Sequence, residues 1–216
     1  MEGILKLKRR HFNVLALAGW AAPTLAQAPA PAILVVGDSL SAEYGLKRGT
    51  GWVALLEERL KREKVQARVV NASISGDTTS GGRSRLAALL RQHKPAVVVI
   101  ELGGNDALRG LPNHMTRDNL AAMARSSREA GAKVLLLGME MPPNYGAKYA
   151  QEFRQVFTTV AQAEKAALVP FFLKGVADTQ DPTALFQSDR IHPNEQAQPL
   201  MRDNVWPELR KLLPRG

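Results

Sequence analysis

A serine, a histidine and an aspartate in two short runs far apart in the chain could together form a nucleophilic site. Ser39 lies in the run Gly37-Asp38-Ser39-Leu40-Ser41, and Asp189 precedes His192 by three residues in the run Asp189-Arg190-Ile191-His192-Pro193. A serine hydroxyl needs a base to take its proton, and histidine serves best when a carboxylate fixes its tautomer. One turn of chain would bring the Asp189 carboxylate to Nδ1 of His192 and leave Nε2 facing Ser39. We therefore predict a serine hydrolase.

Five apolar segments that could form the scaffold alternate with amphipathic helical patterns. Their continuous apolarity, as in Val97-Val98-Val99-Ile100, indicates strands covered on both faces. Repeated alternation of strand and helix predicts an α/β fold with a five-stranded parallel sheet and helices on both sides. A last helix is expected after Pro193, kinked or shortened by Pro199 and Pro207. The predicted strands span residues 32–36, 67–71, 96–102, 133–138 and 167–170, and the other predicted helices span 52–62, 80–92, 116–130 and 148–165.

Polar loops follow the first three predicted strands, with Ser39, Gly76 and Asn105 in successive loops. Ligands bind at the carboxyl ends of parallel strands, so we expect these loops to meet at one edge that Asp189 and His192 can also reach. The backbone N–H groups of Ser39 and Gly76 and the Asn105 side-chain amide are candidate donors to an oxyanion. Each residue alone could be an ordinary turn residue, as we expect for Asp38. Their joint placement after successive strands favours chemistry.

Four sequence blocks carry a family resemblance: the runs around Ser39 and Gly76, the run Gly103-Gly104-Asn105-Asp106, and the run that ends in His192-Pro193. In this order and spacing they resemble the SGNH (GDSL) hydrolase superfamily. Within it, the chain is most similar to the bacterial periplasmic thioesterase I/lysophospholipase L1/protease I group, from about residue 32 to the C-terminus. Arg190 departs from the usual small or acidic residue at that position.

The resemblance implies a three-layer α/β/α flavodoxin-like fold and no metal or cofactor. It implies Ser39 as nucleophile, His192 as base and then acid, Asp189 as its orienting carboxylate, and Gly76 and Asn105 as oxyanion partners of the Ser39 N–H. The implied substrates are fatty-acyl esters, acyl thioesters and lysophospholipids.

Two other functions remain open at this stage. One is a carbohydrate or aryl-ester deacetylase on the same fold. The other is a non-catalytic flavodoxin-like module that binds a nucleotide or an acidic lipid. Residues 76–81 have the G-x-x-x-x-G spacing of a phosphate loop but lack the Lys-Ser/Thr that must follow, which disfavours the module.

The first 28 residues have the layout of a secretory signal peptide. Basic residues precede a short apolar stretch at 14–22, and small residues ending in Ala26-Gln27-Ala28 follow. The apolar stretch is too short to span a bilayer. We expect export to a bacterial periplasm or the medium, with a single domain at 29–216. An uncleaved anchor and a misassigned start codon are the alternatives.

Composition excludes several classes of function. The chain has no cysteine, so disulfides, a thiolate nucleophile and a cysteine metal site are excluded. The formal net charge is +9, and removing the four basic residues and one acidic residue of the leader leaves +6. The other basic residues are interspersed with acidic ones and lack a nucleic-acid motif, so we expect no nucleic-acid partner and at most weak peripheral membrane contact. Nothing in the sequence demands more than a monomer.

Overall fold

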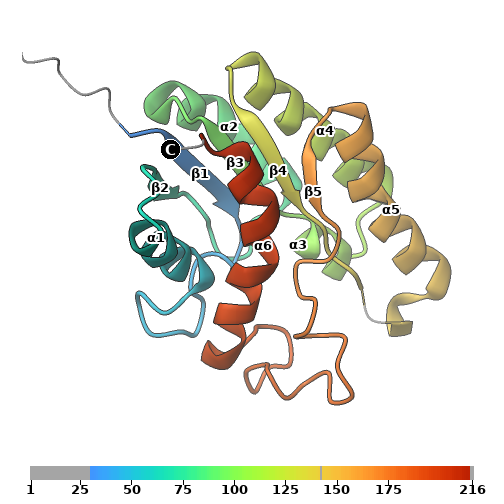
Figure 1. Cartoon of the computed structure of the whole chain (residues 1–216). Helices are drawn as coiled ribbons and strands as arrows, with labels where there is room; N and C mark the ends of the chain where they lie inside the picture. Colours follow the sequence, from blue (N-terminus) through green and yellow to red (C-terminus); the bar gives the residue numbers. More distant parts are fainter. Residues whose placement is uncertain (1–29, 142, 215–216) are drawn as a thin grey trace, which may run out of the picture.

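Five short segments pair into one fully parallel sheet in the order β2-β1-β3-β4-β5 (Figure 1). The computed structural model describes residues 30–141 and 143–214. The predicted α/β fold with a five-stranded parallel sheet is confirmed. The strands are β1 (Ala32–Gly37), β2 (Arg68–Asn71), β3 (Val97–Glu101), β4 (Lys133–Leu137) and β5 (Ala167–Val169).

Helices cover both faces of this sheet, which produces three layers. Helices α1 and α6 pack together on one face, and α2, α4 and α5 pack on the other (Figure 1). The helices are α1 (Trp52–Arg62), α2 (Thr79–His93), α3 (Gly104–Leu108), α4 (Asn113–Glu129), α5 (Ala147–Ala163) and α6 (Gln198–Leu212), with the 3₁₀ turns η1 (Pro143–Tyr145) and η2 (Glu195–Ala197).

The central strands β1 and β3 are buried along their whole length. Both faces of these strands meet helices, which explains their unbroken apolar runs. The edge strand β2 is only partly buried, and polar residues begin and end it. The core therefore runs through the middle of the sheet and holds the carboxyl ends of β1 and β3 in fixed register.

The strand order reverses between β1 and β3. From β1 the chain moves outward to β2 and then returns to the other side of β1 to form β3. The loops that follow β1 and β3 consequently leave the sheet in opposite directions, and ligands bind at this switch point in sheets of this order. Ser39 follows β1 and Asn105 follows β3, so both lie at the switch point.

The C-terminal helix keeps its length despite its two prolines. Helix α6 is not shortened by its prolines, since it runs for 15 residues with Pro199 in its first turn and Pro207 inside it. The first turn of a helix has N–H groups without intrahelical partners, so Pro199 costs little there. Pro207 and Asp203, whose carbonyl loses its helical partner, are exposed, so water can satisfy that carbonyl.

The sequence prediction also missed α3, a short helix that starts three residues after the end of β3. The predicted leader at residues 1–28 lies outside the described residues. Within residues 30–141 and 143–214, every helix is too short or too polar to cross a bilayer.

Candidate active site

Ser39 lies in a tight turn directly after β1. The carbonyl of Asp38 accepts hydrogen bonds from the N–H groups of Ser41 and Ala42, at 3.2 and 2.9 Å. The Asp38 side chain accepts a third from the N–H of Leu40, at 3.0 Å. These bonds wind the chain into a helical turn, and the Ser39 side chain is left half-buried at its surface.

His192 and Asp189 reach Ser39 from the other end of the sequence. Nε2 of His192 lies 2.9 Å from Oγ of Ser39, across 153 residues of chain. Nδ1 of His192 lies 2.7 Å from Oδ2 of Asp189. The three predicted side chains thus form one continuous hydrogen-bonded row, with both imidazole nitrogens in contact.

The Asp189 carboxylate is held by its own loop. Its Oδ1 accepts hydrogen bonds from the N–H groups of Ile191 and His192, at 2.9 and 3.0 Å, which leaves Oδ2 for the imidazole. The pKa of Asp189 is lowered to about 2, chiefly by the His192 N–H and further by the Ile191 N–H and the imidazole. Asp189 is therefore ionised at neutral pH.

The loop that carries this pair has little regular structure. Residues 170–194 contain no helix or strand, and one antiparallel bridge, Phe186 to Pro193, closes the end of the loop. The N–H of Gln187 donates to the carbonyl of His192 at 2.8 Å within this closure. The Tyr44 ring lies against the imidazole of His192, with ring centroids 4.4 Å apart. This aromatic contact was not predicted from the sequence.

Gly76 and Asn105 supply the candidate oxyanion donors. Gly76 has φ +77°, a left-handed conformation that favours glycine, and its carbonyl accepts a hydrogen bond from Arg109 at 2.9 Å. The N–H groups of Ser39 and Gly76 have no hydrogen-bond acceptor among the residues that the structure describes. Nδ2 of Asn105 donates to Oδ2 of Asp38 at 3.0 Å, which ties α3 to the nucleophile turn.

Arg85 holds the loop that contains Gly76 through hydrogen bonds, a role that the sequence analysis missed. From α2, its Nε donates to Asp77 at 2.9 Å, and its two terminal nitrogens donate to the carbonyls of Ala72 and Gly37. One guanidinium therefore joins the end of β1, the end of β2 and the residue that follows Gly76. The signal available in the sequence was weak, because Arg85 resembles any basic residue on a helix face.

Two buried carboxyl groups lie beneath the nucleophile turn. Asp38 is 2% exposed and Glu101, the last residue of β3, is 1% exposed. Burial raises the pKa of Asp38 to about 6. Burial and then the charge of Asp38 raise the pKa of Glu101 well above its usual range. Glu101 was also missed, although an acidic residue that ends an otherwise apolar strand was a usable signal.

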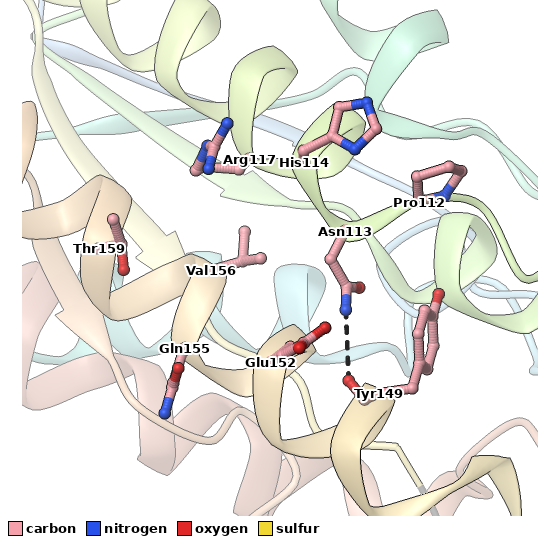
Figure 2. A pocket seen from close by; sticks show the side chains of 9 residues that line it. All are labelled: Pro112, Asn113, His114, Arg117, Tyr149, Glu152, Gln155, Val156 and Thr159. Atoms are coloured by element: carbon pink, nitrogen blue, oxygen red, sulfur yellow. Dashed lines mark hydrogen bonds between the residues drawn. The ribbon is translucent and has the colours of Figure 1, made fainter.

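A separate cavity lies away from these residues. A cavity of about 510 Å³ opens between α4 and α5 and is lined by polar side chains that include His114, Arg117 and Tyr149 (Figure 2). Figure 2 also shows the hydrogen bond from Asn113 to the Tyr149 carbonyl. None of the five predicted site residues lines this cavity. Because acyl transfer needs a nucleophile next to a base, Ser39 and not this cavity is the candidate site.

No group of three or more His, Asp or Glu side chains suited to a metal ion occurs within residues 30–141 and 143–214. The polar groups at Ser39 are instead a hydroxyl, an imidazole, a carboxylate, an amide and backbone N–H groups. This set can activate a hydroxyl and hold a developing negative charge on oxygen.

Known proteins share this arrangement of sequence and fold. Residues 35–199 match the model of the GDSL-like Lipase/Acylhydrolase family. The chain is 57% identical over 187 residues to Esterase TesA of Pseudomonas aeruginosa, which covers 87% of this chain and 92% of that protein. It is 39% identical over 190 residues to Thioesterase 1/protease 1/lysophospholipase L1 of Escherichia coli, which covers 88% of each.

A solved structure agrees with the sequence matches. The crystal structure of TesA superposes with a TM-score of 0.81 at 56% identity, covering 84% of this chain and 99% of that one. The resemblance inferred from four short blocks is thus confirmed over most of the chain. This protein belongs to the GDSL-like lipase/acylhydrolase family, also called the SGNH family, and is a carboxylic ester hydrolase.

Proposed function

We propose that Ser39 is the nucleophile of an acyl transfer in which His192 is the base and Asp189 orients it. His192 takes the Ser39 proton through Nε2 while Oγ attacks the acyl carbonyl carbon. The imidazolium then gives that proton to the leaving alcohol or thiol, and an acyl-enzyme remains on Ser39. A water activated by His192 releases the acid and restores the serine.

The observation that carries this proposal is the row of two short contacts, 2.9 Å from Ser39 to His192 and 2.7 Å from His192 to Asp189. An ionised Asp189 stabilises the imidazolium that forms during attack. It also holds the neutral ring in the tautomer with its proton on Nδ1, which keeps Nε2 free to accept.

The oxyanion of the tetrahedral intermediate is assigned to the N–H groups of Ser39 and Gly76 and to the Asn105 amide. Two of these donors have no other acceptor among the described residues, and Asn105 has one proton to spare beyond its bond to Asp38. Donors fixed before the reaction stabilise charge without reorganising, and each is worth roughly a hundred- to a thousand-fold in rate.

Acyl chains of fatty-acyl esters, acyl thioesters and lysophospholipids are the proposed substrates. Four exposed apolar side chains belong to the segments that carry the site residues: Tyr44 contacts the His192 ring, Ile191 precedes His192, Ile74 precedes Gly76 by two residues and Leu108 ends α3. Exposed apolar side chains on these segments favour acyl chains over a single small acyl group. The names of the curated relatives, an esterase and a thioesterase/lysophospholipase, support the same choice.

A deacetylase on this fold is the alternative, and chain length separates the two. A series of p-nitrophenyl esters from acetyl to lauroyl should show activity well beyond the acetyl ester. A sharp preference for acetyl would favour the deacetylase. A panel that adds acyl thioesters and lysophospholipids would then identify the leaving group.

The leader, the single domain and the +6 charge without a nucleic-acid motif support an exported monomer that acts on small acyl substrates. We propose that residues 1–28 direct it to the periplasm or the medium. Mass spectrometry of protein recovered from that compartment should show a chain that begins near residue 29. Recovery of the full-length chain from the membrane would indicate an anchor instead.

The direct test of the nucleophile is Ser39→Ala. We expect hydrolysis of p-nitrophenyl butyrate to fall by at least about a thousand-fold, because removal of a triad member leaves only the donors and binding. Ser84→Ala is the matched control, since Ser84 is an exposed serine on α2 whose hydroxyl bonds only the carbonyl of Gly81. Undiminished turnover by folded Ser39→Ala protein would reject the assignment.

A further inference from the structure

We propose that Asp38 is a positioning residue for acyl transfer: its carboxylate decides which end of the Asn105 amide faces the oxyanion, and the Glu101 carboxyl beneath holds it in place. This inference rests on the proposed role of Asn105 as an oxyanion donor. It concerns two residues that touch neither the nucleophile oxygen nor the base directly.

The two oxygens of Asp38 have separate partners. Oδ1 accepts the N–H of Leu40 at 3.0 Å, which is a local turn contact. Oδ2 accepts Nδ2 of Asn105 at 3.0 Å, which is a contact between residues 67 positions apart. A turn needs only the first bond. The second one ties the residue before the nucleophile to the side chain that is to stabilise the oxyanion.

An amide side chain can rotate to exchange its oxygen and its nitrogen, and only the nitrogen can stabilise an oxyanion. An ionised carboxylate only accepts hydrogen bonds, so it attracts Nδ2 of Asn105 and repels Oδ1. Asp38 uses one of the two Nδ2 protons and leaves the second available. In the opposite orientation, the Asn105 oxygen would face Asp38, and the amide would lose its bond to that carboxylate.

Glu101 supports Asp38 from the end of β3, where it is in register with Gly37. Its Oε2 accepts the N–H of Asp38 at 3.3 Å and the hydroxyl of Ser41 at 2.8 Å. Trp52 donates its indole N–H to the same Ser41 hydroxyl at 3.2 Å. One carboxyl oxygen thus holds the turn on both sides of Ser39.

The other Glu101 oxygen, Oε1, is buried without a hydrogen-bond partner in the described part of the chain, and Glu101 forms no ion pair there. A buried carboxylate in such surroundings favours its neutral form. The pKa directions agree, because burial raises the pKa of Glu101 well above its usual range and that of Asp38 only to about 6. Asp38 therefore ionises before Glu101, and its carboxylate is charged above about pH 6.

The isosteric variant Asp38→Asn separates the turn from the positioning role. The oxygen of the introduced amide can still accept the N–H of Leu40, so the turn survives. The nitrogen of that amide then faces Asn105 and donates where the carboxylate accepted. That exchange favours the rotated Asn105 amide. Its oxygen then faces the substituted side chain, and its nitrogen no longer faces the oxyanion.

A double-mutant cycle tests the inference in the full chain with p-nitrophenyl butyrate. We expect Asp38→Asn to lower kcat by about ten- to a hundred-fold, somewhat less than removal of a donor, with KM changed by no more than about threefold. In the Asn105→Ala background, Asp38→Asn should cause no further loss, because the side chain it positions is already gone. Glu164→Gln, a buried carboxyl at the far end of α5, should leave kcat unchanged.

Each outcome has a distinct meaning. An equal loss of kcat in both backgrounds, or full kcat in Asp38→Asn alone, overturns the positioning role. If Asn105→Ala alone keeps full activity, the proposed function of Asn105 fails, whatever Asp38→Asn does.

A measurement on the unmutated protein covers the case in which Asp38→Asn does not fold. The side-chain ¹⁵N–¹H signals of Asn105, assigned by their absence from Asn105→Ala, should show one proton shifted downfield and slow to exchange. Two equivalent, fast-exchanging protons would overturn the inference.

Discussion

Ser39 and His192, the proposed nucleophile and base, meet at one point, but they come from regions built in different ways. We call residues 37–41, 72–79 and 101–106 the nucleophile side, and residues 170–194 the base loop. The nucleophile side is joined by buried polar groups, with Asp38 and Glu101 almost fully buried and Arg85 linking three segments. The base loop has no helix or strand, and its Asp189 side chain is 36% exposed.

The difference follows from how far apart the cooperating groups lie in the chain. Asp189 and His192 are three residues apart, so a turn alone can set their geometry even in a partly exposed loop. The proposed oxyanion donors come from three separate loops, so no local structure can align them. Buried and partly buried bonds from Asp38, Glu101 and Arg85 join these loops, and a low dielectric strengthens such bonds. The comparison predicts loss of rate without loss of stability in the base loop, and loss of stability on the nucleophile side.

The largest expected effect is a loss of rate in the base loop. Asp189→Asn should lower kcat by about ten-thousand-fold, because the amide no longer holds the required imidazole tautomer. The melting temperature should stay close to that of the parent, since the side chain is partly exposed. Asp181→Asn is the matched control: Asp181 lies in the same loop and likewise accepts a backbone N–H two residues ahead, from Thr183. Similar rates for the two variants would contradict the assignment.

The next effect is a loss of stability on the nucleophile side. Arg85→Met removes the guanidinium that joins Asp77, Ala72 and Gly37, and it leaves a partly buried carboxylate without its cation. We expect the free energy of unfolding, measured by urea titration, to fall by about 2–3 kcal/mol. Arg91→Met on the exposed face of the same helix is the control. Equal stability of the two variants would show that the Arg85 guanidinium contributes nothing to the free energy of unfolding.

Glu101→Gln sharpens the contrast through pH. In the folded chain Glu101 keeps its proton above the ordinary pKa of glutamate, whereas in the unfolded chain it releases that proton. The free energy of unfolding of the parent therefore falls as the pH rises toward the raised pKa. Glutamine has no proton to release. The unfolding free energy of the variant should rise relative to that of the parent by up to about 1.4 kcal/mol per pH unit between the ordinary pKa of glutamate and the raised pKa of Glu101. Parallel pH curves would mean that Glu101 is ionised in the fold.

The smallest effect concerns the contact between the rings of Tyr44 and His192. Tyr44→Leu removes the ring against His192 and its attraction for the imidazolium that forms during attack. An exposed contact of this kind is worth about 0.5–1 kcal/mol, which corresponds to a two- to fivefold loss of kcat. Tyr44→Phe retains a ring and should recover most of it. Equal rates for leucine and phenylalanine would show that the ring acts only as apolar surface.

Much of the fold could be predicted because each strand carries its burial in its own sequence. The run at 97–100 is apolar throughout, and the structure buries it within β3. Helix α1 begins and ends at the predicted residues. The continuation of α6 through Pro207 could not be predicted. It depends on that residue being exposed to water, which no local pattern of residues reveals.

The sequence by itself determined the local chemistry of this protein: a serine after the first strand, an acid and a base one turn apart, and an α/β order that brings the strand ends to one edge. Only the tertiary structure decided which distant groups touch, across 153 residues for Ser39 and His192 and 67 for Asp38 and Asn105. It also decided that Glu101 is buried without a cation. The physical reason is that turn geometry and apolar periodicity act over a few residues, whereas hydrogen bonds between loops exist only after the core has set the strands in register.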